Sequence, residues 1–124
     1  MMKKTAFRFL VVEDEVMAAM CLEMELKRVG YAVCQRVVSG EEAIVSAAQQ
    51  RPDVVLMDIR LAGELDGIEA AQQIQAAAGI PVIFMTAYPD DNTLERANRL
   101  NPLGFFIKPV KIRDIQTVLG LLAQ

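Results

Sequence analysis

Histidine and tryptophan are absent from the 124-residue chain, and only two cysteines occur, Cys21 and Cys34. They form no Cys-x-x-Cys pair, so a zinc site of the usual cysteine and histidine kind is excluded. Mechanisms that need a histidine base or nucleophile are excluded as well. Both cysteines stand among apolar residues, and this pattern predicts two reduced, buried thiols in a cytosolic protein.

Positively charged residues are outnumbered by negatively charged ones. The chain has 13 Lys and Arg against 16 Asp and Glu, which gives a net charge of −3 and a pI near 4.9. This balance disfavours unselective binding to nucleic acid or anionic membranes. We therefore expect no direct contact with nucleic acid, and any DNA-binding role would have to come from a partner.

Long apolar runs are missing, since no segment approaches the roughly 20 apolar residues of a membrane span. The first residues, MMKKTAFRFLVVEDE, place two lysines before an apolar run, but the run is short and acids end it, unlike a signal peptide. The length is typical of one unit, and 53 % of the residues are apolar. We expect a single cytoplasmic domain over residues 1–124, with no membrane association.

Short apolar runs of strand length are present, and segments with a helical period lie between them. The runs are residues 7–12, 31–38, 54–57, 80–85 and 103–107. Strands that alternate with helices through short connections form a parallel sheet, because each right-handed crossover needs a helix to return the chain. The pattern predicts an α/β fold in which helices cover both faces of a five-stranded parallel sheet.

Local signals mark several element boundaries. Ser39, with Glu42 three residues later, predicts a capping box at a helix start. Gly30 is typical of a helix end, and Pro81 of a strand entrance.

Apolar residues at positions i, i+3, i+4 and i+7 predict the buried faces of two helices. One stripe consists of Met17, Met20, Cys21 and Met24, and the other of Ile112, Ile115, Leu119 and Leu122. We interpret the methionine stripe as core packing, with an adaptable docking face for a partner helix as the alternative.

Polar residues follow four of the five predicted strands. The first strand runs into Glu13 and Asp14, the third into Asp58, the fourth into Thr86 and the fifth into Lys108. Each alone has a plain explanation as a helix cap or as solvated surface. Because the carboxyl ends of parallel strands meet at one edge, where such folds place their working groups, the joint pattern predicts a functional site.

The charges of this set indicate its chemistry. Glu13, Asp14 and Asp58 repel one another in a partly desolvated site, and Lys108 offsets only one of them. A hard dication such as Mg2+ resolves the repulsion, and Mn2+ can replace it. Such a metal attracts a phosphoryl group, which Asp58 would attack as a nucleophile while Thr86 and Lys108 contact the remaining oxygens.

These motifs resemble the receiver domain of bacterial two-component response regulators of the chemotaxis-regulator type. The resemblance covers the whole chain, through FLVVEDE, VVLMDIRL, VIFMTA and GFFIKPV in that order. It implies a (βα)5 flavodoxin-like fold with strand order 2-1-3-4-5. It also implies a cytoplasmic signalling domain that phosphorylates and slowly dephosphorylates itself and that is not a dedicated enzyme.

The resemblance assigns roles residue by residue. Asp58 would accept phosphate from the phosphohistidine of a sensor histidine kinase or a histidine phosphotransfer protein. Asp14 would ligate Mg2+ directly and Glu13 through water, where receivers often carry Asp, and the backbone carbonyl of Arg60 would be a further ligand. Lys108 would contact the phosphoryl group.

A conformational switch is also implied. Thr86 is the switch hydroxyl, and Phe105 stands at the switch aromatic position, where tyrosine is frequent. Phosphorylation would shift the surface of the fourth helix, fifth strand and fifth helix, which is also a homodimer face in this family. Arg60 and Tyr88 flank the acceptor and are expected to lengthen the life of the phosphate by hindering water.

Two other functions remain as alternatives. A receiver-like interaction module would keep the fold without phosphorylation, although the site is complete. An aspartyl-phosphate phosphatase of the haloacid-dehalogenase kind needs an acid two residues after the nucleophile, where this chain has Arg60. A stand-alone receiver and a fragment of a longer regulator both remain open.

Overall fold

The computed structural model describes residues 7–122 and confirms the predicted fold. Five parallel strands form one sheet in the order β2-β1-β3-β4-β5. The strands are β1 (Arg8–Val12), β2 (Ala32–Val37), β3 (Val54–Asp58), β4 (Val82–Thr86) and β5 (Gly104–Ile107). The helices are α1 (Val16–Arg28), α2 (Gly40–Gln50), α3 (Gly67–Ala78), α4 (Asp91–Asn98) and α5 (Ile112–Leu122).

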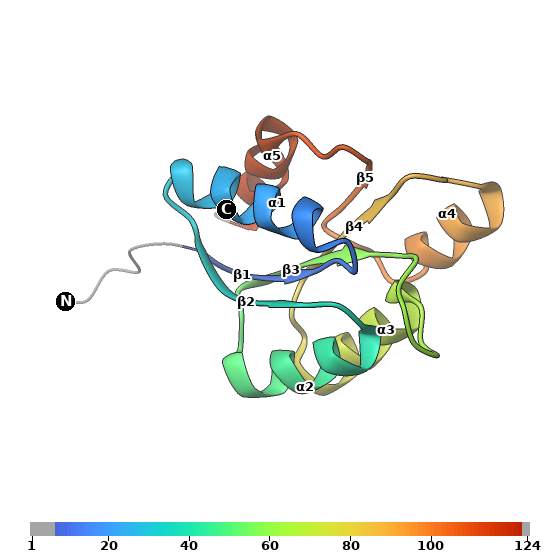
Figure 1. Ribbon diagram of the computed structural model, residues 1–124. Helices are drawn as coiled ribbons and strands as arrows, with labels where there is room; N and C mark the ends of the chain where they lie inside the picture. Colours follow the sequence, from blue (N-terminus) through green and yellow to red (C-terminus); the bar gives the residue numbers. More distant parts are fainter. Residues whose placement is uncertain (1–6, 123–124) are drawn as a thin grey trace.

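Helices cover both faces of the sheet, as the uninterrupted apolar strands require. Figure 1 shows α1 and α5 over one face and α2 and α3 under the other. Successive strand residues point to opposite faces, so Phe9 and Val11 join the core beneath α1 and α5, whereas Leu10 and Val12 join the core above α2 and α3. Every residue of β3 and β4 is buried. These two strands therefore form a rigid support for their carboxyl ends.

Most predicted boundaries are confirmed. Gly30, with φ of 99°, ends α1 in a conformation that favours glycine. The Ser39 side chain accepts a hydrogen bond from the Glu42 N–H. The Glu42 carboxylate, however, accepts from Val38 N–H, so only half of the predicted capping box forms.

The prediction that the methionine stripe of α1 packs in the core is wrong. Met17, Met20 and Met24 are exposed, and α1 buries Ala19, Leu22 and Leu26 instead. At ~100° of rotation per residue the two stripes lie on opposite sides of the helix, and both satisfy a helical period. Periodicity alone could not tell which stripe faces the sheet.

The expectation of two buried thiols is also wrong. Cys21 belongs to the exposed stripe of α1, and Cys34 is only partly buried on the edge strand β2. The Cys34 thiol donates a hydrogen bond to the Phe9 carbonyl at 3.3 Å, and burial raises its pKa. An edge strand and the outer side of a surface helix leave both sulfurs less covered than their apolar neighbours suggested.

The C-terminal helix follows its predicted stripe only in part. Ile115 and Leu119 are buried, whereas Leu122 is exposed at the end of α5. Within residues 7–122, each helix is too short or too polar to cross a membrane.

Candidate functional site

The carboxyl edge of the sheet brings the predicted polar residues together. Asp58 and Thr86 are the last residues of β3 and β4, and Lys108 directly follows β5. A cavity of about 290 Å³ opens at this edge. Its lining consists of Asp14, Glu15, Asp58, Arg60, Thr86, Ala87, Tyr88 and Lys108.

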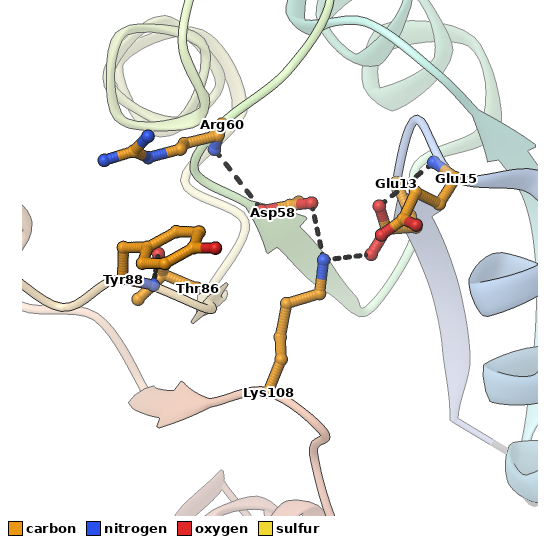
Figure 2. A network of polar contacts seen from close by, with 7 residues as sticks. All are labelled: Glu13, Glu15, Asp58, Arg60, Thr86, Tyr88 and Lys108. Atoms are coloured by element: carbon orange, nitrogen blue, oxygen red, sulfur yellow. Dashed lines mark hydrogen bonds and ion pairs between the residues drawn. The ribbon is translucent and has the colours of Figure 1, made fainter.

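Lys108 joins two buried carboxylates at the floor of this site. Its Nζ donates a hydrogen bond to Asp58 Oδ2 at 2.9 Å and lies 2.6 Å from Glu13 Oε1 (Figure 2). Glu13 is 1 % exposed and Asp58 4 %. Two almost fully buried carboxylates therefore share one ammonium group. The contact between Glu13 and Lys108 was not predicted from the sequence.

The two oxygens of the Glu13 carboxylate have different contacts. Its Oε2 accepts a hydrogen bond from the Glu15 N–H at 3.1 Å. Its Oε1 has no hydrogen bond of regular geometry within residues 7–122, despite the ion pair with Lys108. A buried oxygen with spare acceptor capacity next to a second carboxylate is suited to a cation or to its bound water.

The pKa values report the competition between burial and charge. Burial raises the pKa of Asp58 to about 6, and the neighbouring Glu13 acts in the same direction against the opposing effect of Lys108. Burial also pushes the pKa of Glu13 upward, but contacts with Lys108, Asp58 and the Glu15 N–H bring it below its ordinary value. Burial opposes the charge on Lys108, yet the two carboxylates raise its pKa. Asp58 is therefore the member of the trio whose ionised form is destabilised in the folded protein, which we call strained below.

Three carboxylates are placed to hold a metal. Oxygens of Glu13, Asp14 and Asp58 lie within 4.8 Å of one another. Asp14 is exposed, whereas the other two are buried, so a cation would have one wet side. The all-oxygen donor set and the Glu13 oxygen with spare capacity fit Mg2+. The Arg60 backbone N–H donates to Asp58 Oδ1 at 3.3 Å, while its carbonyl as a metal ligand stays a prediction.

Arg60 and Tyr88 form a pair in the cavity that contains Asp58, and the sequence did not reveal this contact. The Arg60 Cζ lies 5.0 Å from the centroid of the Tyr88 ring, a cation–π contact visible in Figure 2. The two residues come from different loops, after β3 and after β4. Their only signal in the sequence is that each stands two residues after a strand-end polar residue, Asp58 and Thr86.

The two predicted switch residues lie on neighbouring strands. The Thr86 side chain is buried, and its hydroxyl oxygen accepts a hydrogen bond from the Tyr88 N–H at 3.2 Å. Phe105 is partly buried against the core that contains Phe84, its partner in the β4–β5 register. Their roles in a switch stay predictions.

Asp58→Asn is expected to stabilise the metal-free protein near pH 8 by about 1–3 kcal/mol. A raised pKa means that the folded protein holds the Asp58 proton more tightly than the unfolded chain does. The contribution of this proton to the free energy of unfolding is fully present below the ordinary pKa of 3.8 and is lost as the pH rises through about 6. Urea unfolding with a chelator, near pH 5 and near pH 8, measures the effect.

Glu64→Gln is the control for that experiment, because it removes a carboxylate from an exposed loop position. It should leave the stability nearly unchanged at both pH values. Mg2+ should narrow the gap between wild type and Asp58→Asn by relieving the repulsion among the carboxylates. Equal stability of the two proteins near pH 8 without metal would contradict the assignment of Asp58 as strained.

Known proteins share the sequence features and the fold of this chain. The family described as the response regulator receiver domain matches residues 9–120. The chain is 32% identical to the transcriptional regulatory protein PdtaR of Mycobacterium tuberculosis over 108 residues, and 36% identical to ZraR of Escherichia coli K12 over 111 residues. These alignments cover 87% and 89% of this chain but 52% and 25% of the relatives. The chain thus spans about half the length of PdtaR and a quarter of ZraR.

Solved structures show the same fold over nearly the whole chain. The receiver domain of a modulated diguanylate cyclase from Desulfovibrio desulfuricans G20 matches with a TM-score of 0.87 and 39% identity, covering 94% of this chain and 92% of that one. A response regulator structure from Chloroflexus aurantiacus matches with a TM-score of 0.83 and 26% identity, covering 96% and 99%. This chain belongs to the response regulator receiver domain family of two-component signalling.

Proposed function

We propose that this domain accepts a phosphoryl group on Asp58 from the phosphohistidine of a sensor histidine kinase or a histidine phosphotransfer protein. The observation that carries the proposal is the trio at the sheet edge. Asp58 is buried, strained by Glu13 and held by Lys108, and it opens into a cavity of about 290 Å³. A carboxylate in this setting gains more from a phosphoryl group and a cation than a solvated one would.

The transfer is a displacement at phosphorus. A carboxylate oxygen of Asp58 forms a bond to phosphorus as the P–N bond of the donor breaks, and the imidazole leaves with the electron pair and is protonated by solvent. The nucleophile must be ionised, and a pKa of about 6 leaves Asp58 mostly ionised at neutral pH. The Arg60 N–H and Lys108 Nζ fix the orientation of its carboxylate.

Charge at the transferred group is the main obstacle, because the donor brings anionic oxygens to a site with three carboxylates. Glu13, Asp14, Asp58 and the Arg60 carbonyl are the groups that would hold Mg2+, which when bound neutralises phosphoryl oxygens. Lys108 offers its ammonium group to another oxygen, and the Thr86 hydroxyl lies in the same cavity. Besides the metal ligands, the chain would thus contact the phosphoryl oxygens with one ammonium group, that of Lys108, and one hydroxyl, that of Thr86.

The phosphoryl group would act as a covalent ligand that shifts a conformational equilibrium. Thr86 would turn its hydroxyl toward the phosphate, and the Phe105 ring would occupy the vacated space. Thr86 lies on β4 and Phe105 on β5, so their movement would alter the surface formed by α4, β5 and α5. That surface is the proposed output face, for a partner or for a second receiver.

The test is incubation with Mg2+ and a small phosphodonor such as acetyl phosphate, followed by intact mass. We expect a gain of one phosphoryl group that is absent in Asp58→Asn and suppressed by a chelator. A domain that binds Mg2+ but shows no gain would instead be an interaction module that does not use phosphorylation.

The Arg60 and Tyr88 pair is expected to prolong the life of the phosphorylated state. The pair lines the same cavity as Asp58, and we expect its bulk to obstruct a water that approaches the acyl phosphate. Arg60→Ala combined with Tyr88→Ala should speed autodephosphorylation by about fivefold, corresponding to ~1 kcal/mol. The decay of the phosphorylated mass after donor removal measures the rate.

Tyr88→Phe is the matched control, since it keeps the ring and removes only the hydroxyl. Its decay rate should stay close to that of the wild type. A double alanine variant that dephosphorylates at the wild-type rate would show that the pair does not shield the acyl phosphate.

A further inference from the structure

Four sulfur-bearing residues form an exposed stripe along α1, here named the sulfur face: Met17, Met20, Cys21 and Met24. Met17 is 80% exposed, Met24 70% and Met20 48%. The fold does not use this stripe for its core, because α1 packs on the sheet through its opposite side. A contiguous apolar stripe with charges at its ends is typical of an interaction site.

The spacing of the sulfur face is symmetric about the point midway between Met20 and Cys21. Met17 and Met24 lie at equal distances on either side of that point. An antiparallel second α1 would therefore set Met24 against Met17 and Cys21 against Met20 on both sides of a twofold axis. We infer that the sulfur face binds a second copy of this chain through an antiparallel pair of α1 helices.

Charge at the two ends of α1 supports the antiparallel direction. The stripe begins beside Asp14 and Glu15, and the last turn of the helix carries Lys27 and Arg28. Antiparallel pairing therefore brings the acidic segment at the start of one helix close to the basic last turn of the other. Lys27 also pairs with Glu23 in its own helix at 2.9 Å, but its side chain is 58% exposed and free to face a partner. A parallel pair would place like charges together.

A groove beside the sulfur face gives the partner a place to insert a side chain. It measures about 310 Å³ and lies between α1 and the segment after Lys108, with Cys21, Leu22, Pro109 and Val110 in its lining. Methionine is unbranched and adapts to irregular apolar gaps. A methionine of the second copy can therefore fill this groove when the helices pair.

The size of the surface sets the strength of the dimer. A helix of 13 residues is ~20 Å long, so one helix pair buries less than the ~1,600 Å² of a standard interface. The dimer is thus expected to depend on concentration. The sulfur face lies on α1, outside the proposed output face of α4, β5 and α5, although the groove beside it is lined in part by the segment that follows β5. Pairing through this face requires no phosphoryl transfer.

Cys21 provides a direct test, because the symmetry places the two Cys21 residues beside the twofold axis. A short bismaleimide added to the reduced protein should join two chains, as seen on a denaturing gel. Cys21→Ser should abolish the product, and Cys34→Ser should retain it. Cross-linking that is lost in Cys34→Ser but kept in Cys21→Ser would overturn the proposal.

Sedimentation equilibrium tests the face without a reagent. Met24→Glu places a carboxylate in the paired surface and should raise the dissociation constant at least about 10-fold. Val45→Glu is the matched control, on the 55% exposed Val45 of α2, and should leave it unchanged. A wild type that stays monomeric at high concentration would overturn the inference. The sulfur face would then be left for a different protein partner. A dimer that survives Met24→Glu would overturn the inference as well.

Discussion

Lys108→Met is expected to slow phosphoryl transfer from a small donor to Asp58 by about 100-fold, the size of effect seen when one preorganised charge is removed from a transition state. Methionine keeps the length of the side chain and loses its charge. The ammonium group of Lys108 holds both Asp58 and Glu13 at 2.9 and 2.6 Å. Without it, the carboxylates repel the donor and each other. The initial rate of mass gain under saturating Mg2+ measures the effect.

Lys111→Met is the matched control, because it removes an exposed ammonium group three residues further along the chain. Its transfer rate should equal that of the wild type. The folded state of Lys108→Met should be checked by its cooperative unfolding with Mg2+ present. Normal transfer by a folded Lys108→Met domain would remove Lys108 from the site chemistry.

Gly67→Ala is expected to lower the free energy of unfolding by about 3 kcal/mol. Gly67 begins α3, and its N–H donates to the Ile59 carbonyl at 2.8 Å. A Cβ at this position would lie 2.1 Å from the Asp58 carbonyl oxygen, far inside van der Waals contact. The helix start or the end of β3 has to move, and the movement also displaces Asp58. Urea unfolding measures the loss of stability.

Gly120→Ala is the same chemical change, but we expect it to raise the free energy of unfolding. Apart from its chain neighbours and the backbone of its own helix, no atom of the described residues lies within 4 Å of a Cβ built there, and the residue is inside α5. Alanine should therefore stabilise the helix by up to about 1 kcal/mol. If Gly67→Ala were as stable as the wild type, the close packing of α3 against Asp58 would be wrong.

The fold and the composition of the site could be predicted because they depend on few physical rules. Apolar runs such as residues 54–57 had to be strands covered on both faces, and parallel strands bring their carboxyl ends to one edge. Asp58, Thr86 and Lys108 therefore met at a common cavity. The charge argument needed only their residue types.

Contacts between loops and the choice of helix face could not be predicted. The Arg60 and Tyr88 stack depends on how two separate loops bend, which residue types do not specify. The methionine stripe and the buried face of α1 share one period, so only packing decides between them. The smaller residue Ala19 lets α1 approach the sheet, and the methionines are left outside.

Chemical trapping of the phosphorylated residue tests the central claim most directly. Borohydride reduces an acyl phosphate to an alcohol, so the domain treated with Mg2+ and acetyl phosphate and then with borohydride should carry homoserine in place of Asp58. Peptide mass mapping should find this change at Asp58 alone and only after treatment with the donor. Reduction at Glu13 or Asp14, or a phosphorylated protein that yields no homoserine at position 58, would contradict the account.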